Sequence, residues 1–259
     1  MSKKNVEIYV VSHKRFNPVA GGCYKTIAVG PGLLSDKSFH EYLRDDSGDN
    51  ISSKNPNYCE LTAHYWMWKN SKADVIGLCH YRRYFTTKVF SDDPAYIPDE
   101  KQILSILDSG YDIVLPYRPV ARRTVKEIYC DFGFTKDLDT LRAVLSEKYP
   151  EYLGEYDALM ERHSNYPANM MICSKALFDE YSAWLFDILF EVEKRTDLTG
   201  YTPQQARIYG FMSERLLEVW VRQKKLKIKH LRLVNTEKTY TLKSRCTEVL
   251  GIALNRFKY

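Results

Sequence analysis

A histidine, two arginines and two tyrosines follow one short apolar run in the sequence. The run spans Val75 to Leu78, and the residues after it include His80, Tyr81, Arg82, Arg83 and Tyr84. Arginine offers a planar fork that pairs at two points with phosphate, tyrosine can stack on a base or a sugar, and histidine can donate, accept or carry a proton. This group predicts a binding site for an anion. The alternative is a strand end whose arginines pair with surface carboxylates.

The apolar run predicts a core strand of a parallel sheet, because it carries no charge and polar residues flank it. In open α/β sheets, ligands bind beyond the carboxyl ends of the strands. Two further predicted strands end in the same way: His13 and Lys14 follow residues 6–11, and arginines follow residues 111–116. These strand ends together predict one cleft for an anion, most simply a nucleotide diphosphate.

Helical periodicity alternates with these strands along most of the chain. The clearest amphipathic stretch runs from Leu177 to Val192, and further helices are predicted at 57–70, 99–109, 138–149 and 205–221. Strands that alternate with helices are typical of β–α–β units. We therefore predict an α/β fold with a mostly parallel central sheet flanked by helices, in a single domain that spans residues 1–238.

Several functional classes lack their signatures in this sequence. The six cysteines are scattered and form no CxxC pair, so neither a zinc site nor a redox motif is indicated. The GxGxxG fingerprint of dinucleotide enzymes, the GxSxG nucleophile elbow and the P-loop are all absent. No run of 18 apolar residues is present, and the N-terminal MSKKNVEIYVVSHK leads into a strand without a signal-peptide pattern. We therefore expect a cytoplasmic protein.

An acidic loop with the sequence LRDDSGDNI begins at position 43. Its alternating polar residues resemble calcium-loop ligands, but the glycine is out of position and Pro56 stands where such a loop needs a glutamate. We favour a loop that hydrogen-bonds a ribose or simply closes a turn. Its candidate side chains are Asp45, Asp46, Asp49 and Asn50.

Four sequence blocks together resemble one family. They are VSHK from position 11, RDDSGDNISSKNPNYCELTAHYWMWKN from 44, IGLCHYRRYF from 76 and ARIYGFMSERLLEVW from 206. The chain is similar, from about Glu7 to Glu237, to bacterial glycosyltransferases of polysaccharide synthesis that are catalogued as domain of unknown function 4422. The combination of blocks is specific, whereas any one block alone is weak.

The resemblance implies a GT-A-like fold and a UDP-sugar donor, with UDP-galactofuranose as one candidate. It also implies a glycan or a lipid-linked oligosaccharide as the acceptor, in capsule, exopolysaccharide or O-antigen synthesis. Nucleic acid is not expected as a partner. The alternative is a non-catalytic nucleotide- or glycan-binding subunit of a polysaccharide assembly complex.

The candidate site residues fall into three groups under this resemblance. Donor-binding candidates are His13, Lys14, Lys25, Asn50, Asn55, Glu60, Tyr81, Arg82, Arg83 and Tyr84. Catalytic candidates, which include the general base for the acceptor hydroxyl, are Asp45, Asp46, Asp49, His80 and Glu214. Acceptor-binding candidates are His163, Asn165, Asn169 and Arg215. For Glu214 and Arg215 the alternative is a solvated helix face.

Many GT-A enzymes hold a divalent metal with an Asp-x-Asp motif at the end of a strand, and the matching strand end here reads HYRR from position 80. Positive side chains can neutralise a departing diphosphate directly, as a metal otherwise would. We therefore predict that Mg²⁺ or Mn²⁺ is not strictly required. The alternative is a metal held by Asp45, Asp46 or Asp49, with the diphosphate as a further ligand.

The C-terminal part of the sequence is strongly basic. Its last 39 residues carry 11 lysines and arginines against two glutamates, a net +9, whereas the other 220 carry 27 against 31, a net −4. Segment 239–259 alternates apolar and basic residues as an interfacial amphipathic helix does, although packing against the body is the alternative. Because each basic residue near an anionic surface contributes about 1 kcal/mol, we predict peripheral binding to the inner face of the plasma membrane.

Flotation with anionic vesicles tests this membrane role. The full chain should float at low salt and be released at high salt, because salt screens the attraction. A shortened chain that ends at Thr239 should stay in the soluble fraction at both salt concentrations. Equal recovery of the two chains in the soluble fraction at low salt would contradict the prediction.

Overall fold

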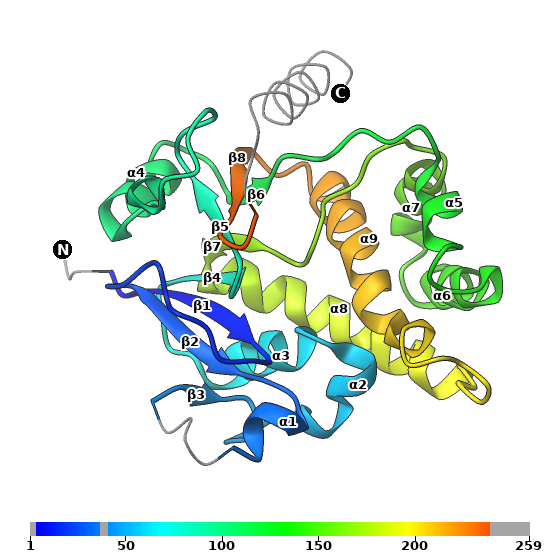
Figure 1. The fold of residues 1–259 in the computed structure, drawn as a ribbon. Helices are drawn as coiled ribbons and strands as arrows, with labels where there is room; N and C mark the ends of the chain where they lie inside the picture. The colour runs from blue at the N-terminus through cyan, green and yellow to red at the C-terminus, as the bar shows by residue number, and fades with distance from the viewer. Residues whose placement is uncertain (1–3, 37–40, 239–259) are drawn as a thin grey trace.

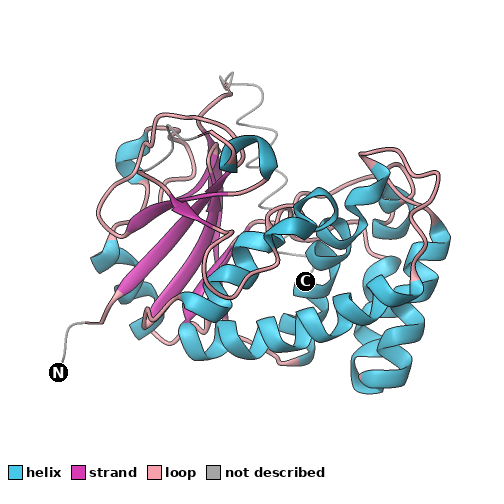
Figure 2. Ribbon diagram, turned by 90° about the horizontal axis from the view of Figure 1, so that it is seen from below, coloured by secondary structure: helices cyan, strands magenta, loops and turns pink. Residues whose placement is uncertain are grey.

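One mixed sheet forms the centre of the protein in the computed structural model, which describes residues 4–36 and 41–238 (Figure 1). The strand order is β3-β2-β1-β4-β5-β8-β6-β7, and β4 also pairs with β7. Most of the helices lie on one side of this sheet (Figure 2). The strands are β1 (Val6–Ser12), β2 (Tyr24–Ala28), β3 (Leu43–Arg44), β4 (Val75–His80), β5 (Arg83–Thr86), β6 (Ile113–Pro116), β7 (Met171–Ser174) and β8 (Ile228–Asn235). The helices are α1 (Pro31–Leu34), α2 (Asn55–Tyr58), α3 (Leu61–Asn70), α4 (Glu100–Asp108), α5 (Val125–Tyr129), α6 (Thr135–Lys148), α7 (Leu153–Met160), α8 (Lys175–Arg195) and α9 (Ile208–Gln223).

The half of the sheet from β3 to β4 is parallel, as the sequence predicts. All seven residues of β1 are buried, which is the pattern of a parallel strand covered on both faces. The register pairs Val11 of β1 with His80 of β4. The two strands therefore end side by side, and the polar residues that follow them meet at one edge of the sheet.

The other half of the sheet is largely antiparallel, so the prediction of a mostly parallel sheet is wrong there. The pairs β4–β5, β4–β7, β5–β8 and β6–β7 are antiparallel, and only β6–β8 is parallel among the pairs described in this half. For β4 and β5, the cause of the antiparallel pairing lies in the connection between the two strands. Only Tyr81 and Arg82 separate β4 from β5, and so short a connection must bring the chain back antiparallel.

The predicted helix at 57–70 is in fact two helices, α2 and α3. Cys59 separates them, and its φ of 53° lies in the left-handed region that residues with a side chain rarely adopt. The side chain of Asn57 in α2 donates to the carbonyl of Ala206 at 2.9 Å. The break ends α2 so that Cys59 and Glu60 come to line a cleft.

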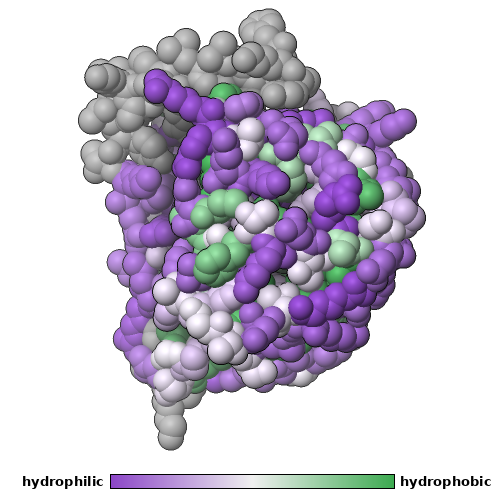
Figure 3. Space-filling model, turned by 90° about the vertical axis from the view of Figure 1, so that its right-hand side faces the viewer, coloured by the Kyte–Doolittle hydropathy of each residue, from purple (hydrophilic) through white to green (hydrophobic). Residues whose placement is uncertain are grey.

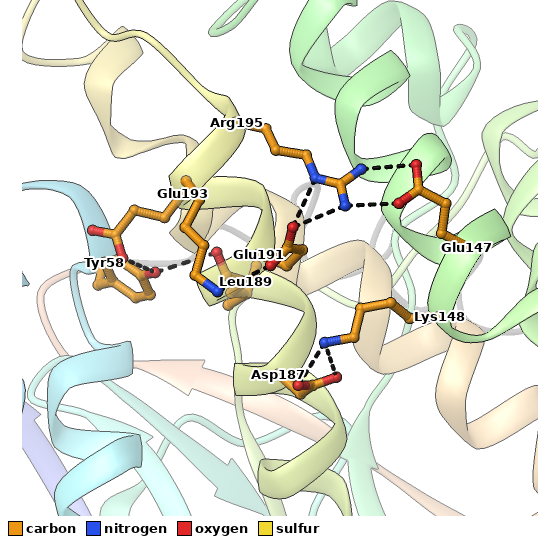
Figure 4. A network of polar contacts seen from close by, with 9 residues as sticks. Tyr58, Glu147, Lys148, Asp187, Leu189, Glu191, Glu193 and Arg195 are labelled. Atoms are coloured by element: carbon orange, nitrogen blue, oxygen red, sulfur yellow. Dashed lines mark hydrogen bonds and ion pairs between the residues drawn. The ribbon is translucent and has the colours of Figure 1, made fainter.

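Helix α8 packs its apolar stripe into the core and ties the neighbouring helices together near its C-terminal end (Figure 4). Glu193 accepts from Tyr58 of α2 at 3.1 Å and pairs with Lys54 at 2.7 Å. Arg195 pairs with Glu147 of α6 at 2.7 Å. Partly exposed ion pairs each contribute less than about 1 kcal/mol, so we infer that they chiefly orient α2 and α6 on α8.

The basic C-terminal segment 239–259 lies outside the described residues, so its boundary, its amphipathic helix and its membrane role stay predictions. Within the described part of the chain, none of the helices combines the length and the apolar character that crossing a membrane demands.

Candidate functional site

A cleft of about 650 Å³ opens at the carboxyl ends of β1 and β4. The sheet contributes one wall through His13 and the β4–β5 turn, and the other wall comes from α2, the start of α1 and α9. Of the residues predicted from the sequence, those that line the cleft are His13, Asn55, Glu60, His80, Tyr81, Arg82, Arg83 and Glu214.

The sheet wall is cationic, and the β4–β5 turn positions it. The backbone N–H of Tyr81 donates to the carbonyl of Val11 at 3.0 Å, and the carbonyl of Arg82 accepts from the N–H of Thr236 at 3.0 Å. Arg82 and Lys14 lie over the ring of Tyr81, 5.5 and 4.7 Å from its centroid. Both cations also contact Glu237, at 3.6 and 2.9 Å. One carboxylate thus faces two cations, and Arg83 lines the cleft beside them.

His80 lies at the floor of this wall. Its Nε2 atom is buried without a hydrogen-bond partner among the described residues. Burial lowers the pKa of His80, and the charges of Arg83 and Arg82 lower it further, whereas Glu60 opposes them. His80 therefore lines the cleft with a buried, unpartnered nitrogen, and its lowered pKa favours the neutral form.

The helical wall carries two carboxylates, Glu60 and Glu214, and two consecutive residues of the segment before β7 hold them. Glu214 on α9 accepts from the N–H of Ala168 at 3.0 Å, and Glu60 accepts from the side chain of Asn169 at 2.8 Å. Ala168 has a φ of 58°, the second unusual backbone conformation at the cleft after Cys59. Such conformations cluster at functional sites in proteins.

Burial raises the pKa of Glu214 to about 7, although the neighbouring Arg215 opposes the shift. The second carboxylate, Glu60, raises this pKa further. A carboxyl group that titrates near neutral pH can both accept and release a proton under physiological conditions. Glu214 is therefore the carboxyl group of this wall best suited to proton transfer.

The carboxylates of the acidic loop lie outside the cleft, because local partners hold them. Asp45 is fully buried and accepts from the hydroxyl of Ser52 at 2.8 Å. Asp46 pairs with Arg44 at 2.7 Å. Asp49 and Asn50 are also absent from the lining, and their hydrogen bonds, to Tyr65, Asn70, Ser52 and Gly48, stay within the loop and the adjacent α3.

Besides Asn50, three more of the predicted donor-binding residues lie outside the cleft lining. Lys14 stands near it, on the ring of Tyr81. Lys25 pairs with Glu7 of β1. Tyr84 is buried in the core with its ring near Tyr24.

The predicted acceptor-binding residues are dispersed, and none of them lines the cleft. His163 is exposed, and Asn165 donates to the carbonyl of Tyr166 at 3.2 Å. Asn169 is buried and supports Glu60 from behind. Arg215 is buried with its guanidinium 5.2 Å from the ring centroid of Tyr129, so it does not lie on a solvated helix face. Glu214 lines the cleft, and its side chain is 25% exposed there.

Other lining residues were not predicted from the sequence. Arg207 donates to the sulfur of Cys59 at 3.0 Å, and its guanidinium lies 5.7 Å from the ring centroid of Phe211. Gly30 to Gly32 form the rim near α1. A signal for Arg207 was present, because it stands seven residues before Glu214 and shares its helical face.

The cleft residues fit an anion better than a divalent metal. No group of three or more His, Cys, Asp or Glu side chains with metal-binding geometry occurs within residues 4–36 and 41–238. The arginines that stand in place of an Asp-x-Asp motif would repel a cation. The metal requirement itself stays a prediction.

The raised pKa of Glu214 predicts that the stability of the folded protein depends on pH. The unfolded chain ionises this group near pH 4.5 and the folded chain near pH 7, so the folded state loses stability as pH rises between these values. Glu214→Gln removes that loss and should be about 2–3 kcal/mol more stable than the unchanged protein at pH 8, with most of the gain gone at pH 5. Denaturant unfolding at both pH values measures it.

Glu161→Gln, at an exposed glutamate, is the matched control and should change stability equally at the two pH values. A gain from Glu214→Gln that does not grow between pH 5 and pH 8 would show that the carboxyl group is not held in its protonated form.

Comparison with known proteins places the chain in a family. The solved apo structure of the WbbM bifunctional glycosyltransferase is similar, with a TM-score of 0.78 and 30% sequence identity over 90% of this chain and 46% of that one. The chain thus spans about half the length of WbbM. The mannosyltransferase Ktr4p from S. cerevisiae matches with a TM-score of 0.34 and 12% identity, over 82% of this chain and 62% of that one, and supports no conclusion. No curated protein matches the chain. The family model described as Domain of unknown function (DUF4422) matches residues 7–225, which confirms the resemblance seen in the sequence blocks: the chain belongs to this family.

Proposed function

We propose that the protein is a glycosyltransferase that moves a sugar from a UDP-sugar to a glycan or lipid-linked acceptor in polysaccharide synthesis. The observation that carries the proposal is the two-walled cleft, with cations on one wall and a carboxyl group of near-neutral pKa on the other. The similarity to WbbM, which is described as a bifunctional glycosyltransferase, supports it. A GT-A-like arrangement with galactofuranose as the transferred sugar is the finer form of the proposal.

Arg82 and Arg83 would bind the diphosphate of the donor. In the transfer step an acceptor oxygen bonds to the anomeric carbon, and the bond from that carbon to the diphosphate oxygen breaks. Negative charge then develops on the departing UDP, and fixed cations at this position stabilise it. Two arginines in consecutive positions can supply this charge without a metal.

Glu214 would take the proton of the attacking acceptor hydroxyl. It can do so only in its ionised form, and a pKa near 7 leaves a substantial ionised fraction at neutral pH. Glu60, held by Asn169, would keep the acceptor hydroxyl oriented beside it. His80 would donate from or accept at its buried Nε2 when a ligand fills the cleft.

The competing function is a non-catalytic subunit that binds a nucleotide or a glycan. It requires the cation wall but gives no role to a carboxyl group of raised pKa that lines the same cleft. Hydrolysis of a UDP-sugar, even if slow, separates the two functions, because a binding subunit would not catalyse it.

The two arginines provide the first test. Arg82→Ala and Arg83→Ala should each weaken UDP binding by about 1.5–3 kcal/mol, the range for hydrogen bonds to charged groups, and calorimetry with UDP measures this. We expect the lower end for Arg82, whose side chain is 42% exposed. Lysine at either position should not restore a two-point contact.

Arg15→Ala is the matched control, because Arg15 is exposed after the neighbouring strand β1 but does not line the cleft. Unchanged UDP affinity in both arginine variants would refute the donor assignment. Hydrolysis of UDP-galactofuranose that is lost in the same variants would favour the transferase over the binding subunit.

A second test concerns the metal. Transfer or hydrolysis should persist in excess EDTA, because the cleft presents arginines where metal-dependent enzymes present carboxylates. Complete loss of activity in EDTA, with recovery on addition of Mg²⁺ or Mn²⁺, would show that the expectation is wrong.

A further inference from the structure

The helical wall of the cleft continues outward through two aromatic rings. Phe211 lines the cleft, and the ring of Phe132 lies against it with 5.5 Å between the ring centroids. Phe132 is 39% exposed, which makes it one of the few large apolar side chains on the described surface. Phe132 follows α5 (Val125–Tyr129). Figure 3 shows the side of the molecule on which α5 lies in Figure 1, where apolar patches interrupt a mostly hydrophilic surface. The aromatic wall therefore joins the cleft to open surface.

Phe132 is held in place although it is exposed. Its backbone N–H and that of Gly133 both donate to the carbonyl of Tyr129, at 2.9 and 3.0 Å. Gly133 is pressed against Tyr129 so closely that an added Cβ would lie 2.8 Å from its ring. The turn fixes the backbone of Phe132 and the contact with Phe211 restrains its ring, so less side-chain entropy is lost when a ligand binds.

The order of residues on α9 connects these rings to the proton-transfer group. Phe211 and Glu214 are three residues apart on the helix and therefore share a face. Arg207 stands one helical turn before Phe211, and its guanidinium lies 5.7 Å from the centroid of the Phe211 ring. A molecule bound along the two rings would therefore extend into the cleft toward Glu214. The wall that carries Arg82 and Arg83 lies opposite.

We propose that Phe132 and Phe211 form the platform for the acceptor, and that its occupant is a sugar ring of a glycan. This rests on the proposed transferase function. Sugar rings present C–H faces to aromatic rings and hydroxyl groups at their edges, so one ring can cover Phe132 while a hydroxyl group points into the cleft. The donor diphosphate belongs on the cationic wall, which leaves the aromatic side for the second substrate.

Phe132→Ala tests the platform, and Phe134→Ala is its matched control. Phe134 is 40% exposed and two residues further along the chain, but its ring packs on Tyr201 at 4.9 Å, whereas the ring of Phe132 packs on Phe211. The probes are UDP-galactofuranose as donor, UDP alone for donor affinity, and the octyl glycosides of galactose, glucose, mannose and N-acetylglucosamine as acceptors. The thermal unfolding midpoint of each variant shows whether it folds.

Phe132→Ala should raise the KM for the acceptor by roughly tenfold, with kcat, donor hydrolysis and UDP affinity little changed. Phe134→Ala should leave all four quantities unchanged. Equal effects of the two variants on the acceptor KM, or a fall in kcat with an unchanged acceptor KM, would overturn the platform.

Saturation-transfer NMR with the same octyl glycosides separates this proposal from the function itself. If the unchanged protein transfers no sugar to any of them, the proposed function fails for these substrates, but the platform is still measured. Weaker saturation of the sugar-ring protons in Phe132→Ala than in Phe134→Ala then supports it, and equal or absent saturation in the unchanged protein and both variants overturns it.

Discussion

The hydrogen bond from the side chain of Asn169 to Glu60 holds together the segments on which the helical wall depends. The same amide group accepts from the hydroxyl of Ser213 at 2.9 Å, and its neighbour Ala168 binds Glu214 through the backbone. Two consecutive residues before β7 thus fix both carboxylates of the cleft. Asparagine suits this position because it both donates and accepts, and a buried replacement that does only one would leave a partner unsatisfied.

The cationic wall depends on a different constraint, which is the length of the β4–β5 connection. His80 pairs with Arg83 across the turn, so the residues between them must project from the end of the sheet. Their spacing is therefore set by covalent geometry, whereas the spacing of the carboxylates is set by packing and hydrogen bonds. The difference explains why the sequence reveals one wall more readily than the other.

The strands at the centre and the cationic strand end could be predicted, because β1 and β4 are continuous apolar runs with polar residues directly after them. The antiparallel half was not predicted, because β5 begins with Arg83 and its residues were interpreted as part of a binding site and not as a strand. The place of the acidic loop outside the cleft could not be predicted, because composition does not show that Ser52 and Arg44 are the partners of Asp45 and Asp46. Two further features depend on long-range contacts with no local pattern: the burial of Arg215 and the contact of Phe132 with Phe211.

The cleft lies at a seam between two layers, because its cationic wall belongs to the sheet and its carboxylate wall to the helices. A ligand that contacts both walls therefore links the two layers, and its binding free energy stabilises their packing. The converse also holds by linkage. Contacts that hold α2 in the free protein, such as those of Glu193 with Tyr58 and Lys54, therefore also favour the binding of such a ligand, because they order part of the cleft lining beforehand.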